Sequence, residues 1–133
     1  MGHRMAKREL GKVGSVHRST ERGINVIVDV KFPGTGQGLV SPSLDEATLV
    51  DYERELCALF GVRRLHDIVG QECFALRPRE GFGEFIVGLE CEGRRFTLAG
   101  FRRKHWPDKA PGPDEAFLSA LDPDYTDWET APL

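Results

Sequence analysis

Basic and aromatic side chains alternate in one stretch near the end of the chain, residues 94–106. This stretch carries five formal positive charges and no acidic residue. Arginine and lysine neutralise phosphates, and exposed aromatic rings stack on bases, so the combination is typical of sites for single strands and nucleotides. We therefore predict a ligand- or partner-binding site that is made by Arg94, Arg95, Phe101, Arg102, Arg103, Lys104 and Trp106.

Two other interpretations of residues 94–106 stay open. Lysine and arginine on a strand edge discourage edge-to-edge aggregation, so the charges can belong to a solvated strand end. They can also attract an acidic segment, either of a protein partner or of this chain.

A second candidate site is the glycine-rich run after the most strongly patterned strand, with Gly34, Gly36, Gln37 and Gly38 as its members. Its spacing is one residue short of the dinucleotide-binding fingerprint, and the next expected helix starts too late for its dipole to meet a pyrophosphate. The run is expected to be a loop. It is either a simple connection between strands or a nest of backbone N–H groups that binds an anion.

No catalytic or metal-binding motif is recognisable in the sequence. The histidines lie far apart, beside different expected elements, whereas proton transfer needs a base within hydrogen-bond reach of its partner. Three cysteines at wide spacing favour reduced core residues over a disulfide framework or a metal pair: Cys57, Cys73 and Cys91. We predict a protein that is not an enzyme and that carries no cofactor and no metal.

The elements that must position these residues begin with a strand over residues 24–32. Apolar residues alternate with polar ones there, so Ile24, Val26, Val28, Val30 and Phe32 are expected on one buried face. A weaker strand over residues 12–18 precedes it and forms a hairpin with it. Residues 1–9 are expected to be a frayed basic leader.

A helix is expected over residues 43–60. Residues 43–46 have the capping-box pattern with Ser43 as the N-cap, and Gly61 is placed to end the helix in a left-handed conformation. Leu65, Ile68 and Val69 are then expected to enter the core.

Strands return over residues 71–77, 84–91 and 94–99. Alternation in the second of these places Phe85, Val87, Leu89 and Cys91 inward and leaves Glu84, Glu90 and Glu92 on an exposed face. The order β-β-α-β-β-β predicts an α+β fold, an antiparallel sheet of about five strands with one main helix packed on one face.

Charge divides the chain into two parts, although the formal net charge of the 133 residues is only −3. Residues 107–133 hold seven acids, one base and five of the eight prolines, whereas residues 1–106 carry an excess of three positive charges. We predict a single α+β domain over 1–106 and an irregular acidic, Pro-rich tail over 107–133. The tail is expected to dock on its own domain or on a partner.

The chain resembles a family of small uncharacterised proteins encoded by phages, prophages and plasmids. The residues that carry the resemblance are Ser19-Thr20 with Gly23-Ile24, Gly34-Thr35-Gly36-Gln37-Gly38, Phe60-Gly61-Val62 through Leu65 to Gly70, and Lys104-His105-Trp106-Pro107. They span about residues 12 to 107. The resemblance implies an accessory protein of a mobile element in a bacterial host. The chain has no run of eighteen or more apolar residues and its start lacks the apolar region of a secretion signal, so we expect a cytoplasmic protein that is not associated with a membrane.

Three functions follow as hypotheses. The first is a non-enzymatic phage or mobile-element protein that binds a host component, such as a host-defence protein that it inhibits. The second is a nucleotide- or nucleic-acid-binding module that sequesters a phosphate-bearing ligand. The third is a structural virion component, and with it comes the prospect of a homo-oligomer.

Overall fold

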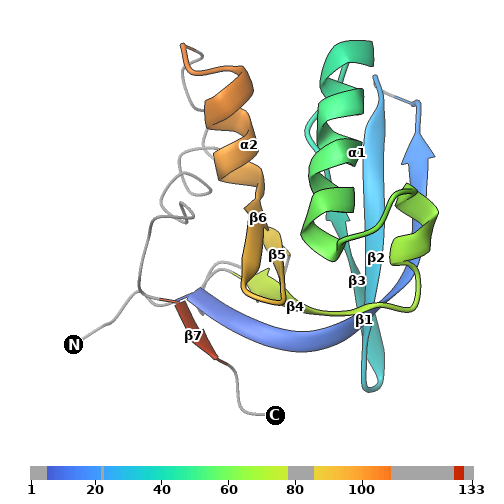
Figure 1. The fold of residues 1–133 in the computed structure, drawn as a ribbon, viewed down its shortest axis with the longest axis vertical. Helices are drawn as coiled ribbons and strands as arrows, with labels where there is room; N and C mark the ends of the chain where they lie inside the picture. The colour runs from blue at the N-terminus through green and yellow to red at the C-terminus, as the bar shows by residue number, and fades with distance from the viewer. Residues whose placement is uncertain (1–5, 22, 78–85, 109–127, 131–133) are drawn as a thin grey trace.

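The computed structural model describes residues 6–21, 23–77, 86–108 and 128–130, and Figure 1 shows how their helices and strands are arranged. The strands are β1 (Ala6–Ser19), β2 (Asn25–Phe32), β3 (Thr35–Val40), β4 (Glu72–Arg77), β5 (Gly88–Cys91), β6 (Arg94–Thr97) and β7 (Trp128–Thr130). The helices are α1 (Glu46–Phe60), α2 (Leu98–His105) and the short 3-10 helix η1 (Leu65–Ile68).

The predicted α+β fold is confirmed, and the sheet has more strands than the five or so expected. Six strands form an antiparallel sheet in the order β3-β2-β1-β4-β5-β6, and β7 pairs in parallel with the start of β1. The expected frayed leader is wrong for residues 6–9, because they belong to β1. None of the described helices is both long enough and apolar enough to cross a membrane.

The long strand β1 holds the two halves of the sheet together. Its first half pairs with β4 and its second half with β2, and the register shifts between Val13 and Ser15. A bulge of this kind bends a strand and increases its twist, and β1 follows a clear arc in Figure 1. Gly11 lets the Phe32 ring pack closely against β1, since a Cβ there would lie 2.7 Å from that ring.

The core lies between the sheet and α1. The alternation predicted for β2 is confirmed at Val26, Val28, Val30 and Phe32, which are all buried, while Ile24 is only half-buried. From the helix, the side chains that enter the core are Tyr52, Leu56, Leu59 and Phe60.

The main helix ends where the sequence predicts but begins two residues later. Gly61 is the left-handed C-cap, with a φ of 69°. Ser43 is not the N-cap, because Leu44 still donates a backbone hydrogen bond to Ile24 as part of a β-bridge. Asp45 caps α1 instead, and its carboxylate accepts from the Thr48 N–H while the Thr48 hydroxyl accepts from the Asp45 N–H.

Three further expectations need correction or fall outside the described chain. Ile68 is buried as predicted and Leu65 is half-buried, but Val69 is 45% exposed, so it does not enter the core. Within the strand expected at 84–91, β5 covers only Gly88–Cys91, and Glu84 and Phe85 are not among the described residues. Of the expected tail, Pro107, Asp108 and the short strand β7 are described.

Candidate partner-binding surface

The predicted basic site is divided between a strand and a helix. Arg94 and Arg95 lie on β6, whereas residues 98–105 form α2 rather than the end of a strand. The Thr97 hydroxyl caps α2 by accepting from the Gly100 N–H. The basic stretch is therefore not the continuous strand edge that its alternation predicts.

Arg94 and Arg95 are both engaged within the molecule. The Arg94 guanidinium donates to the Leu59 carbonyl at 2.8 Å, at the C-terminal end of α1, and lies 3.3 Å from Glu92. Such a contact satisfies an orphan carbonyl and complements the negative end of the helix dipole. Arg95 pairs with Glu90 at 2.9 Å.

Glu90 is buried, contrary to the prediction that it is a solubilising surface residue. Its side chain bridges two arginines, because one carboxylate oxygen pairs with Arg8 and the other with Arg95. The Arg8 guanidinium also lies over the Phe74 ring, 5.0 Å from its centroid. This cluster gives a carboxylate that is only 7% exposed two arginine partners in β5.

The aromatic residues of the predicted site face the core rather than solvent. Phe101 is 2% exposed and packs edge-on against Tyr52, with ring centroids 5.0 Å apart. Trp106 is half-buried and packs against the same core. Phe101 therefore has no free face for stacking on a base, which removes one of the two predicted stacking rings.

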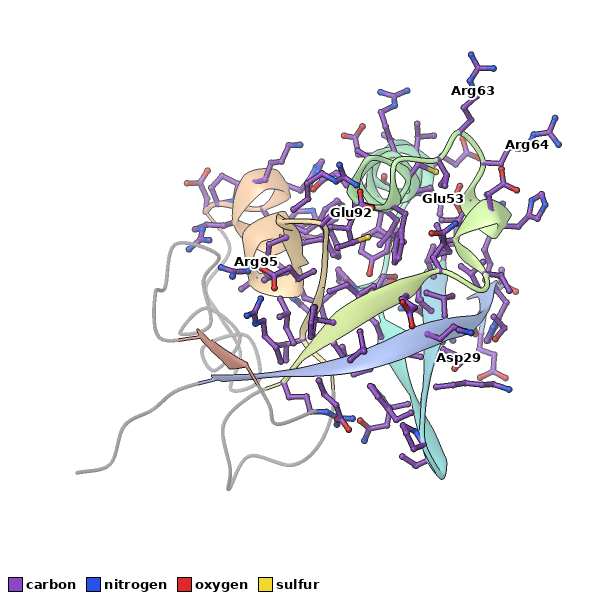
Figure 2. The ribbon with its side chains drawn as sticks, turned by 60° about the horizontal axis from the view of Figure 1, so that its bottom comes forward. Asp29, Glu53, Arg63, Arg64, Glu92 and Arg95 are labelled. Atoms are coloured by element: carbon purple, nitrogen blue, oxygen red, sulfur yellow. The ribbon has the colours of Figure 1, made fainter. Side chains whose placement is uncertain are left out.

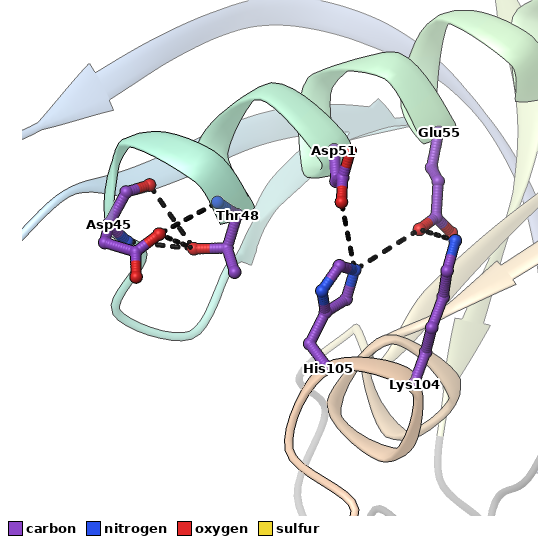
Figure 3. A network of polar contacts seen from close by, with 6 residues as sticks. All are labelled: Asp45, Thr48, Asp51, Glu55, Lys104 and His105. Carbon is purple, nitrogen blue, oxygen red and sulfur yellow. Dashed lines mark hydrogen bonds and ion pairs between the residues drawn. The ribbon is translucent and has the colours of Figure 1, made fainter.

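The basic end of α2 faces acidic residues of α1, as Figure 3 shows. Lys104 lies 3.2 Å from Glu55, and His105 lies 3.8 Å from Asp51 and 4.0 Å from Glu55. Arg102 is half-buried and Arg103 is exposed. These contacts give α2 a structural role, since they hold it against the main helix.

The glycine-rich run is a hairpin and not a loop. Pro33 and Gly34 form the turn, where Gly34 has a φ of 81°, and Gly36, Gln37 and Gly38 belong to β3. Proline followed by a left-handed glycine is typical of a type II turn. Because β3 and β6 are the two ends of the strand order, the structure does not join the glycine run and the basic stretch into one site.

A different set of charges is available at the end of α1, where a groove of about 470 Å³ lies between α1 and η1. We call it the arginine groove. Its lining includes the apolar side chains of Ala58, Val62 and Leu65 and the arginines Arg54 and Arg63. The next residue, Arg64, is exposed as well, and Figure 2 shows Arg63 and Arg64 extending away from the body of the protein.

The arginines of the groove have no acidic partner among the described residues. Glu53 lines the same groove, but Arg18 occupies both of its carboxylate oxygens at 2.9 Å. This bidentate contact raises the pKa of Arg18. The arginine pair at 63–64 and Arg54 could have been noticed in the sequence, but only the fold brings Arg54 and Arg63 to one groove.

The three cysteine thiols are not activated as nucleophiles, because the pKa of each is raised. Burial raises the pKa of Cys73 to about 12, and burial, Glu53 and Asp67 raise the pKa of Cys57. All three thiols are free, with Cys73 and Cys91 buried as predicted and Cys57 half-buried.

Serine, histidine and aspartate meet on the exposed side of β1 and β2, but not in catalytic order. The Ser15 hydroxyl donates to Asp29 at 2.6 Å, and His17 lies 3.6 Å from the same Asp29 oxygen. A triad requires the histidine between the serine and the acid. Within the described ranges, no group of three His, Cys, Asp or Glu side chains could hold a metal ion.

No protein-family model matches the sequence, and the searches for similar curated proteins and similar solved structures gave no match. The resemblance to phage, prophage and plasmid proteins thus stays a prediction.

Proposed function

We propose that this protein is a non-enzymatic binding protein that contacts an acidic segment of a host protein through the arginine groove. The observation that carries the proposal is the pair Arg54 and Arg63, exposed around an apolar floor without an acidic partner among the described residues, with the exposed Arg64 next to Arg63 in the chain. Arginine is enriched at the energetic centres of protein interfaces. A mobile-element accessory protein, with a host-defence protein as its target, is the biological setting that the resemblance implies.

The composition of the groove favours an acidic protein segment over nucleic acid. Its lining holds no aromatic side chain for a base to stack on. Apolar residues at Ala58, Val62 and Leu65 suit a segment in which acidic and apolar side chains alternate.

The test compares two charge reversals of the same size in the full chain. Arg63→Glu changes the groove, and Arg103→Glu changes an exposed arginine of α2, the surface that the sequence predicts. Each protein is used as bait in a bacterial lysate, and binding to two labelled probes is then measured: a short peptide of alternating glutamate and leucine, and a single-stranded oligonucleotide. Circular dichroism checks that both variants are folded.

The proposal expects Arg63→Glu to lose both the captured host protein and the peptide, with affinity for the peptide at least about tenfold weaker, while Arg103→Glu keeps both. Equal binding by the two variants would overturn the groove as the contact surface. Oligonucleotide binding that weakens with rising salt, without peptide binding, would favour the sequestering module instead.

A further inference from the structure

The outer edge of β3 is an unpaired edge in the described part of the chain. On one side β3 pairs with β2, and no described strand lies on the other side. An edge strand presents a row of backbone N–H and C=O groups that can pair with another strand. Which residues present these groups follows from the register of the hairpin.

The register identifies the outward-facing residues. The Ser41 N–H donates to the Val26 carbonyl, so Val26 and Ser41 are a hydrogen-bonded pair, and such pairs alternate along an antiparallel ladder. The residues of β3 that bond to β2 are therefore Thr35, Gln37 and Leu39. The remaining residues direct their backbone N–H and C=O groups away from the sheet: Gly36, Gly38 and Val40.

The outward N–H and C=O groups of β3 can pair with the same groups of a second copy. We propose that the protein forms a two-fold symmetric dimer in which β3 pairs antiparallel with β3 of a second copy, centred on Gly38. In this register, Gly38 faces Gly38 of the second copy, and Gly36 faces Val40 in both directions. All three outward residues of each copy then donate and accept, which gives six hydrogen bonds between the copies.

Neighbouring registers of the β3–β3 pair leave more backbone groups unpaired. If the two-fold axis is centred on Leu39 instead of Gly38, Gly38 of each copy pairs with Val40 of the other, and Gly36 stays unpaired. The opposite shift pairs Gly36 with Gly38 and places Val40 against Gly34, which belongs to the turn and has a φ of 81°. The register centred on Gly38 is therefore the one that satisfies the most backbone groups.

The side chains of β3 do not protect this edge. Proteins protect exposed edges with lysine, proline or inward charges, and β3 contains none of them. Two of its outward residues are glycines, so no side chain blocks the approach of another backbone, and the third is Val40, an apolar residue that is 49% exposed. By contrast, β6, the strand at the other end of the strand order, carries two charged residues, Arg94 and Arg95.

The test measures dimerisation of the purified full chain by sedimentation at increasing concentration, together with amide hydrogen exchange. The proposal expects a concentration-dependent dimer in which the amides of Gly36, Gly38 and Val40 become protected. The amides of Thr35, Gln37 and Leu39 should be protected at every concentration, because they bond to β2.

Val40→Pro is the disrupting variant, since it removes an outward N–H from each copy while the ladder with β2 stays intact. Loss of two of the six hydrogen bonds is expected to weaken the dimer by about tenfold. Glu46→Pro is the control, because Glu46 is the first position of α1, where proline is tolerated. A monomer at all concentrations, a dimer with unchanged exchange at Gly38, or assembly into rings would each overturn the proposal. The dimer uses β3 and the proposed function uses the arginine groove, so either can fail alone.

Discussion

Removing the negative charge of Glu90 should destabilise the fold far more than removing that of a neighbouring surface glutamate. In Glu90→Gln the arginines Arg8 and Arg95 keep their positions but lose the carboxylate that both contact. Breaking a fully buried ion pair costs about 3–5 kcal/mol, and a hydrogen bond to a charged group contributes about 1.5–3 kcal/mol. Because the two arginine side chains are 27% and 25% exposed and keep part of their hydration, we expect a loss of about 2–3 kcal/mol.

The assay is equilibrium unfolding in urea. With a slope of about 1–3 kcal/mol per molar for a small protein, the midpoint should fall by about 0.7–3 M. Glu92→Gln is the control two residues along the chain, since the Glu92 side chain is 79% exposed and its contact with Arg94 is worth at most about 0.5 kcal/mol. If Glu90→Gln unfolds within about 0.5 kcal/mol of the wild type, the cluster is not a stabilising ion network and the argument fails.

Three further predictions concern the caps of α1 and the thiols. Gly61→Ala should lower the free energy of unfolding by about 1 kcal/mol in the same assay, since alanine is strained at a φ of 69°; an unchanged midpoint would contradict this. The hydrogen bonds from Thr48 hold the pKa of Asp45 below its usual range, so its contribution to stability is present above about pH 4 and is lost as the pH falls through that lowered pKa. Asp45→Asn should keep the cap at neutral pH and flatten this acid dependence, which unfolding curves measured at several pH values would show. A thiol reagent should modify Cys57 first and Cys73 last, because burial keeps Cys73 protonated; reaction of Cys73 at the rate of Cys57 would be inconsistent with its raised pKa of about 12.

The parts of the fold that the sequence predicts well are those fixed by a long regular pattern. The period-two alternation of β2 and the helical periodicity of α1 each bury one face, and Gly61 ends α1 because glycine adopts the left-handed conformation there. The N-cap at Ser43 fails for a tertiary reason. The Leu44 backbone bonds to Ile24, so the chain is still extended one residue past the predicted cap.

The candidate site is predicted poorly because charges on a sequence do not reveal their partners. Arg95 and Lys104 look available for a ligand, but the fold places Glu90 and Glu55 beside them. The helix α2 is also missed, since residues 94–99 alternate like a strand while Thr97 caps a helix that begins in the same window. In contrast, Arg63 becomes a candidate only because Arg18 occupies Glu53, a residue 35 positions away from Arg18 in the chain.

The most direct test of the arginine groove is chemical-shift mapping of the labelled full chain during titration with the glutamate–leucine peptide. The proposed function predicts that the largest changes fall on Arg54, Val62, Arg63 and Arg64, with little change along α2. Changes confined to residues 94–106, or no saturable change at any residue, would contradict it.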